Sequence, residues 1–240
     1  NASFTAGDSF TAILEPLPVS LTGTAMTCAD IGSHPVAGLA GDGMDSAVHE
    51  AGETYTFEAK VTMETDVTLD DCNIIIKNQW KIAGSSASIP TLTIGAGHTF
   101  TAADLGAGIK GNLMSATTLY PGLVVVQGAL VLNDAKMTNI GYGSSGAAID
   151  LGAGASMTVS SNSAIIGAAA SGISNTIIQV GKDSIFNFDD STITANGGTA
   201  LKFNEKATQA DFNNGSISNA DVGIHSVNGE PQVWDYILNN

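Results

Sequence analysis

An internal repeat constrains this chain more than any other feature of its sequence. Each repeat unit holds three short stretches of alternating apolar and polar residues, separated by turns rich in Gly, Asn, Asp and Lys. Alternation with a period of two is typical of a β-strand that has one buried face. The units lie at residues 123–141, 148–167, 177–197 and 200–220, and a weaker one begins at Ile224.

The inward-facing residues of each unit follow from this alternation. For the first stretch we expect the inward pairs Val124/Val126, Ile149/Leu151, Ile178/Val180 and Leu201/Phe203. For the second stretch the expected pairs are Leu130/Leu132, Met157/Val159, Phe186/Phe188 and Ala210/Phe212. The third stretch is expected to contribute Ile140, Ile165, Ile193 and Ile217, at 16, 16, 15 and 16 residues from the first inward residue.

The spacing of the units predicts the fold class. Successive units begin 25, 29, 23 and 23 residues apart, and the extra residues fall at one corner, in 143–146 and 168–170. Three short strands in a circuit of roughly 20–30 residues is the plan of a parallel β-solenoid, whose coils bury their inward faces by stacking. The sequence therefore predicts an all-β fold, a parallel β-solenoid with three short strands per coil.

Similar coils can be recognised upstream of the clear repeats. Residues 91–94 followed by Phe100 match the strand–turn–strand opening of a unit. The segment 70–78 is similar to the acidic corner and third strand at 189–196. We therefore expect the solenoid to cover residues 54–240.

Coils of three strands with Asn and Asp at their corners resemble the right-handed parallel β-helix of pectin-lyase-like proteins and of many prokaryotic surface proteins. The resemblance covers residues 54–240 and rests on the pattern of the coils, without a catalytic motif. It implies a right-handed β-helix in an extracellular or cell-surface protein. It also implies an alternative function, because such folds host polysaccharide lyases and hydrolases.

Residues 1–53 do not join the repeat. Because the terminal coil of a solenoid needs a cover, we interpret this segment as a cap, with a separate interaction segment as the alternative. Cys28 and Cys72 are the two cysteines of the chain, and a disulfide between them would fasten the cap to the coils. Two buried free thiols are the alternative.

Composition and charge exclude several classes of protein. The chain has 8 basic and 23 acidic residues, a net charge of −15 and 43% hydrophobic residues. This composition excludes a disordered chain. The basic residues are all lysines and are scattered along the sequence, which excludes binding of nucleic acid through a basic patch. No apolar run reaches the roughly 20 residues of a membrane span.

Three features favour an extracellular or cell-surface location. The chain begins at Asn1 without a leader, which we interpret as a mature segment lacking its secretion signal. A disulfide is typical of oxidising compartments. Asn214 begins the N-glycosylation triplet Asn214-Gly215-Ser216.

The resemblance also implies which residue types would carry catalysis. It implies a basic residue, commonly Arg, in the lyases, and clustered Asp with Gly-His-Gly and Arg-x-Lys segments in the hydrolases. This chain has no Arg, so Lys182, Lys202 or Lys206 would have to serve. Asp189 and Asp190 are adjacent, but His225 lies in Gly-Ile-His-Ser. We therefore expect no catalytic site and no cofactor.

The polar corners have a structural explanation. Asn and Asp tolerate left-handed backbone and form hydrogen bonds within their own turn. Asn139, Asn196 and Asn219, near the ends of third strands, are expected to stack into a ladder of side-chain amides. The densest group of potential metal ligands matches no zinc or calcium pattern, and we interpret it as a solvated acidic loop. It consists of His34, Asp42, Asp45, His49 and Glu50.

The sequence favours a non-enzymatic structural protein, a subunit of a cell-surface filament, sheath or surface layer. An uncovered final coil would expose strand edges that template further pairing, so we expect association end to end with a second copy. Surface glycans are a further candidate partner, as for an adhesin. The residues expected at the assembly contact are Phe4, Phe10, Ile13, Leu14, Trp234, Tyr236 and Ile237.

Overall fold

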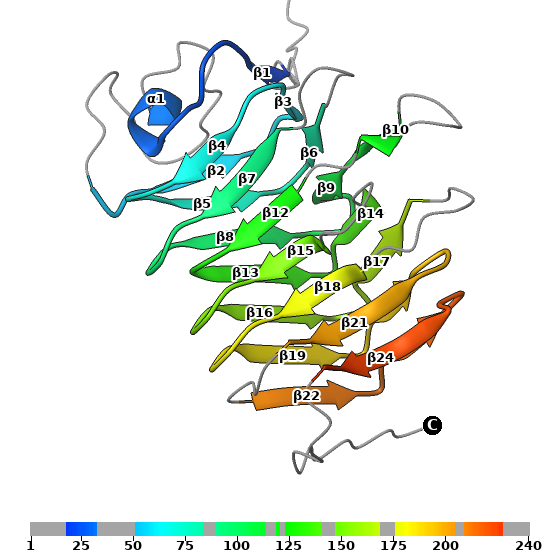
Figure 1. Ribbon diagram of the computed structural model, residues 1–240. Helices are drawn as coiled ribbons and strands as arrows, with labels where there is room; N and C mark the ends of the chain where they lie inside the picture. Colours follow the sequence, from blue (N-terminus) through cyan, green and yellow to red (C-terminus); the bar gives the residue numbers. More distant parts are fainter. Residues whose placement is uncertain are drawn as a thin grey trace, which may run out of the picture.

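The structure, a computed structural model, covers most of the repeat region and part of the N-terminal segment. Its strands wind into a right-handed parallel β-solenoid with three strands per coil, which confirms the predicted fold class. Blue β1 and α1 lie at one end of the stack, and β22 and β24, orange to red, lie at the other (Figure 1). The described residues are 18–32, 51–83, 90–113, 119–120, 123–140, 147–168, 176–204 and 209–227.

Each complete coil contributes one strand to each of three parallel sheets, numbered here in the order of passage. Sheet 1 contains β4 (Val67–Leu69), β7 (Thr91–Ile94), β12 (Leu123–Val126), β15 (Ala147–Leu151), β18 (Thr176–Val180), β21 (Thr199–Phe203) and β24 (Val222–Ser226). Sheet 2 contains β2 (Thr54–Phe57), β5 (Asn73–Ile76), β8 (Thr99–Ala103), β13 (Ala129–Asn133), β16 (Ser156–Ser160), β19 (Ile185–Asp189) and β22 (Gln209–Asn213). Sheet 3 contains β1 (Val19–Leu21), β3 (Val61–Met63), β6 (Gln79–Ile82), β9 (Gly108–Lys110), β14 (Lys136–Ile140), β17 (Ala164–Gly167), β20 (Thr192–Thr194) and β23 (Ser216–Ser218). Outside these sheets lie the helix α1 (Cys28–Gly32) and the antiparallel pair β10 (Asn112–Leu113) and β11 (Leu119–Tyr120).

The register of sheet 1 confirms where the repeat units begin. A slip of one residue would turn every side chain of a strand to the other face, so the register decides which residues form the core. The upstream segment also follows the pattern, because Leu92 lies opposite Val124 and Phe100 lies opposite Leu130. The residues that begin the units pair in a single column, in the order Val124, Ile149, Ile178, Leu201 and Ile224.

The third strand of the first unit contains Ile140, which is buried as expected, but its register differs from the expected one by three residues. The residue opposite Ile165 is Met137, whereas Ile140 lies opposite Gly167, beyond an irregularity in the register. In this unit only two residues separate the first strand from the second, against four in the next unit. The turn before the third strand is also shorter, two residues against three, so a constant spacing counted from Val124 reaches Ile140 and passes Met137, the residue opposite Ile165.

The segment 70–78 does not lie at the same corner as 189–196, contrary to the expectation. Ile74 lies opposite Phe100 in sheet 2, whereas Ile193 lies opposite Ile165 in sheet 3. Both corners have an acidic pair before an alternating strand, so the residues alone do not distinguish one corner from the other.

The corner between sheets 2 and 3 has the left-handed backbone expected of its polar residues. Asp134, Asn162, Asp190 and Asn214 have φ angles of 52°, 60°, 45° and 47°. Asn and Asp adopt this region more readily than most residues. The backbone N–H of Asn162 donates to the carbonyl oxygen of Asp190 in the next coil at 2.7 Å, so the corners also stack on one another.

The expected ladder of asparagine amides is not the arrangement found at Asn196. Asn139, Asn196 and Asn219 do share left-handed φ angles of 54°, 55° and 53°. However, Nδ2 of Asn196 donates to the carbonyl oxygen of Gly167 in the preceding coil at 2.8 Å. That coil has Gly167 and Ala168 at this corner, which interrupts the column of asparagines.

The core contains the predicted phenylalanines. Phe186, Phe188, Phe203 and Phe212 are buried, as expected. The rings of Phe188 and Phe212 stack with their centroids 4.7 Å apart. A Cβ added to Gly215 would lie 2.6 Å from atoms of both rings, so this corner accommodates the aromatic stack only with glycine.

Part of the N-terminal segment joins the solenoid. Val19 of β1 lies opposite Val61 of β3, and Met26 forms a parallel bridge with Val67 of sheet 1. Residues 19–26 therefore begin a coil ahead of β2. The structure describes only residues 18–32 and 51–53 of the first 53, and the domain boundary between residues 53 and 54 stays a prediction.

Candidate functional site

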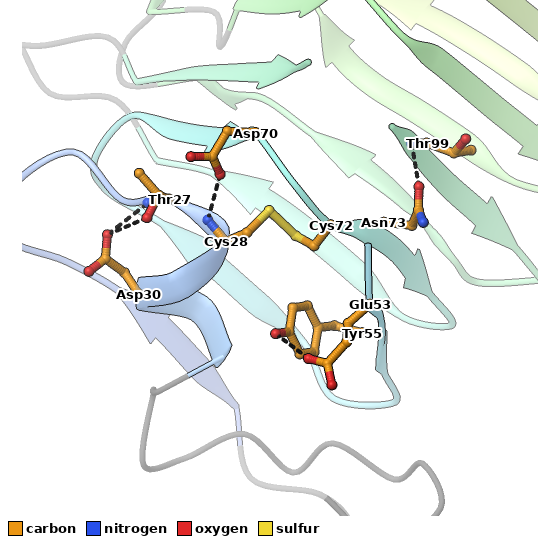
Figure 2. The surroundings of a disulfide bond; sticks show 9 residues. All are labelled: Thr27, Cys28, Asp30, Glu53, Tyr55, Asp70, Cys72, Asn73 and Thr99. Carbon is orange, nitrogen blue, oxygen red and sulfur yellow. Dashed lines mark hydrogen bonds between the residues drawn. A yellow bond between two sulfur atoms is a disulfide. The ribbon is translucent and has the colours of Figure 1, made fainter. Parts of the chain in front are cut away.

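A disulfide closes the end of the solenoid that holds β1 and β2. The sulfur atoms of Cys28 and Cys72 are 2.04 Å apart and their Cα atoms 5.8 Å, which confirms the predicted bond. Cys28 begins α1, and Cys72 lies at the corner between β4 and β5 (Figure 2). Both residues are fully buried. The bond indicates a non-cytoplasmic protein, because disulfides persist in oxidising compartments.

Hydrogen bonds orient α1 on this end. A carboxylate oxygen of Asp30 accepts from the backbone N–H of Thr27 at 2.8 Å and from its hydroxyl at 3.0 Å, as in a helix capping box. The backbone N–H of Cys28 donates to Oδ1 of Asp70 at 3.1 Å (Figure 2). Ile31 is buried against the coils. The helix therefore covers apolar surface of the solenoid end.

The group of Cys28, Asp70 and Asp71 is part of this closure. Their potential ligand atoms lie within 4.8 Å of one another, the spacing of a metal site. However, the sulfur of Cys28 is bonded to Cys72, and Asp70 already accepts the hydrogen bond from Cys28. We therefore assign the three residues a structural role.

Tyr55 of β2 belongs to the same end. Its side chain is buried, and its hydroxyl donates to Oε2 of Glu53 at 2.8 Å (Figure 2). Burial raises the pKa of Tyr55 above its usual value near 10, and the hydrogen bond to Glu53 and the charges of Glu53 and Asp71 raise this pKa further. The protonated hydroxyl is therefore favoured by folding.

We expect the free energy of unfolding to fall as the pH rises above about 10. The unfolded chain releases the proton of Tyr55 before the folded chain does, because the folded-state pKa is higher. The stabilisation is therefore complete below the unfolded-state pKa and is lost as the pH rises through the folded-state pKa. Urea denaturation at a series of alkaline pH values measures this decline. Tyr55→Phe should make the decline shallower, and an equally steep decline in the variant would contradict the assignment.

The opposite end of the solenoid is less well covered. Ile178 and Leu201 are buried, but Ile224, next in the same column, is only partly buried. Ala210 in sheet 2 and Ile217 in sheet 3 lose burial at the same coil. Among the described residues, β22, β23 and β24 each pair on one side only. Within the described ranges, this coil therefore has strands paired on one side only and inward residues that are only partly buried.

Several predicted residues lie outside the part of the chain that the structure describes. Asn214, the predicted glycosylation residue, is described and lies exposed at a corner, and its modification stays a prediction. The residues outside are the assembly residues Phe4, Phe10, Ile13, Leu14, Trp234, Tyr236 and Ile237, and the potential metal ligands His34, Asp42, Asp45, His49 and Glu50.

The candidate catalytic residues lie on different surfaces. Asp189 and Asp190 are exposed at the corner between sheets 2 and 3, whereas Lys182 lies in the turn between β18 and β19. Lys202 and His225 are neighbours on the outer face of sheet 1. Lys206 lies outside the described residues. The two aspartates therefore share a face with neither described lysine.

Sequence reasoning missed a cluster of lysines. Lys81, Lys110 and Lys136 are far apart in the sequence, but β6, β9 and β14 bring them together on the outer face of sheet 3. Aligning the outward positions of successive coils would have found them, because residues in the same column of a solenoid lie side by side.

The fold and the closed end together define a disulfide-bonded parallel β-solenoid protein. No family model matches the chain, and neither does any curated protein or solved structure. In the part of the chain that the structure describes, no helix is long and apolar enough to cross a membrane.

Proposed function

We propose that this chain is a non-enzymatic structural protein of the extracellular space or cell surface, a subunit of a filament, sheath or surface layer. Copies associate through the ends of the solenoid. The resemblance of the coils to the right-handed β-helices of prokaryotic surface proteins, including the pectin-lyase-like ones, supports this proposal. The disulfide supports it as well, because it fits an oxidising compartment.

The difference between the two ends carries the proposal. At one end the disulfide and α1 cover the coil, and Tyr55 and Ile31 are buried. At the other end one column of inward residues in each sheet loses burial at the same coil, at Ala210, Ile217 and Ile224, while Phe212 stays buried. Unpaired strand edges template pairing with further strands. Heterologous contacts between two different ends propagate into a fibre when the rotation does not close.

Light scattering and sedimentation velocity at increasing protein concentration test the association. We expect species that grow with concentration, and smaller species for Ile224→Asp, which places a charge in the open cross-section. Thr158→Asp is the matched control, because Thr158 faces outward on β16, between buried Met157 and Val159.

Deleting residues 1–17 tests the other side of the contact. This deletion removes Phe4, Phe10, Ile13 and Leu14 and keeps β1 and Cys28. We expect it to reduce association without unfolding the coils. A monodisperse monomer of the complete chain at all concentrations would overturn the proposal.

A further inference from the structure

Three lysines form a patch on the outer face of sheet 3. In the register of this sheet, Lys81 lies opposite Lys110, and Lys136 lies opposite Gly108, two residues before Lys110. Each lysine has a buried neighbour on its own strand, and these neighbours are Trp80, Ile109 and Met137. Because side chains alternate along a strand, the lysines point outward. Neighbouring strands are about 4.8 Å apart, which places Lys81 directly beside Lys110. We call Lys81, Lys110 and Lys136 the lysine patch.

The described carboxylates near the lysine patch, among them Asp134 two residues before Lys136, form no ion pair with its lysines. Lys77 is paired with Glu58 at 2.8 Å, and the charge of nearby Asp104 also raises the pKa of Lys77. None of the three lysines of the patch forms an ion pair with a carboxylate in the described ranges. Like charges directly opposite one another destabilise a sheet. A negatively charged partner would remove this cost.

A hollow of about 310 Å³ opens beside the patch. Gln79, Lys136 and Thr138 line it, and Gly108 lies between them. A Cβ at Gly108 would lie 1.8 Å from the carbonyl oxygen of Lys136, so only glycine fits at this position. Leu105, 80% exposed, stands at the edge of the hollow. The hollow has room for an acidic side chain beside Lys136.

An array of carboxylates with a matching repeat begins in the coil of Lys136 and continues toward the β22 end of the solenoid. Asp134, Asp189 and Asp190 lie at the corner between sheets 2 and 3, and we call them the aspartate ridge. Asp134 and Asp190 are two coils apart, as are Lys81 and Lys136. Both arrays therefore extend about 10 Å along the axis. No ion pair with a lysine of the described residues is formed by these aspartates.

We propose that the lysine patch of one copy binds the aspartate ridge of a second copy, so that two solenoids lie side by side. This inference rests on the proposed function, to which it adds a lateral contact. Both arrays include a residue of the coil of β13 and β14, from which the patch extends toward the β1 end and the ridge toward the β22 end. A two-fold rotation that makes the axes antiparallel therefore brings each patch onto the other copy's ridge, which is an isologous contact.

Net charge does not prevent this contact at moderate salt. Two chains of −15 repel each other at long range. At 0.15 M salt the Debye length is about 8 Å, so distant charges are screened while pairs in direct contact still attract. Dimers are therefore expected at about 0.15 M salt and should dissociate at about 1 M salt, where the Debye length falls to about 3 Å.

Charge reversal with mixing tests the lateral contact. One variant carries Lys81→Glu and Lys110→Glu, and the other carries Asp189→Lys and Asp190→Lys, both with Ile224→Asp to suppress contacts between ends. Each variant alone should dimerise at least about tenfold more weakly than Ile224→Asp itself, because patch and ridge then have the same sign. An equimolar mixture should regain dimers, because both contacts are again between opposite charges. Sedimentation velocity measures the dimer.

Further variants separate the possible outcomes. Lys60→Glu with Lys182→Glu changes two exposed lysines outside the patch and should leave the dimer intact. Circular dichroism checks that each variant is folded.

If Ile224→Asp is monomeric at every salt concentration, or if mixing the two variants restores no dimers, the proposed lateral contact is wrong. Association between the ends is measured separately, by comparing the species formed by the complete chain with those formed by Ile224→Asp. Retention on a heparin resin that depends on Lys81 and Lys110, without dimers, would assign the patch to a polyanion instead.

Discussion

Replacing Phe188 by alanine is expected to lower the free energy of unfolding by roughly 3–5 kcal/mol. The ring is fully buried on β19, and its centroid lies 4.7 Å from that of Phe212 and 6.1 Å from that of Phe186. Removing the ring leaves a cavity in the core. The backbone hydrogen bonds of β19 with β16 and β22 hold the coils in place, so the cavity cannot close. Urea denaturation followed by circular dichroism measures the loss.

Ile185→Ala provides the matched control for Phe188→Ala. Ile185 lies on the same strand but faces outward and is 36% exposed. We expect a change within about 1 kcal/mol, as for most surface substitutions. If Phe188→Ala also cost less than about 1 kcal/mol, the ring could not lie in the core, and the register of β19 would be wrong.

The alternation of apolar residues was sufficient to predict the columns of sheets 1 and 2. A strand repeats every two residues whatever precedes it, so Val124, Ile149 and Ile178 could be aligned from the sequence alone. The corner residues were predictable for a related reason. Few residue types tolerate the left-handed backbone that Asp190 and Asn214 adopt, so the composition of a corner indicates its geometry.

The third strand was harder to predict because turn lengths differ between coils. The short turns before β13 and β14 place Met137, and not Ile140, opposite Ile165. The part of the first coil formed by β1 and Met26 was missed, because a single three-residue strand and one bridge have too little alternation to stand out. The position of this segment depends on its pairing with β3 and β4, and this pairing forms only in the folded chain.

The lysine patch could not be recognised until the coils were aligned. Lys81, Lys110 and Lys136 are far apart in the sequence, and neither their neighbours nor their spacing indicates a motif. Their proximity depends on the register Gln79–Gly108–Lys136 across three strands. The turn between β9 and β12 also contains the extra pair β10 and β11, which lengthens this coil and hides the period.

Removing the disulfide with Cys28→Ala and Cys72→Ala is expected to cost about 4 kcal/mol. The bond spans 44 residues of sequence, and a loop of this length restricts the unfolded chain strongly. The variant also loses the covalent tether of α1, leaving Ile31 and the hydrogen bond to Asp70 to hold the helix. Urea denaturation of the double variant measures the loss, and the intact mass of the native protein should be lower by two hydrogen atoms than that of the reduced chain.

The location of the effect distinguishes a tether from a general loss of stability. In a solenoid each coil contacts only its neighbours, so stability is lost locally. Hydrogen exchange in the double variant should therefore rise in β1, β2 and β3 and stay nearly unchanged in β16 and β19. The Tyr55→Phe variant, whose change lies at the same end, is the comparison that keeps the disulfide. A uniform rise along the whole stack, or a loss below about 1 kcal/mol, would contradict the role of the bond as the fastening of this end.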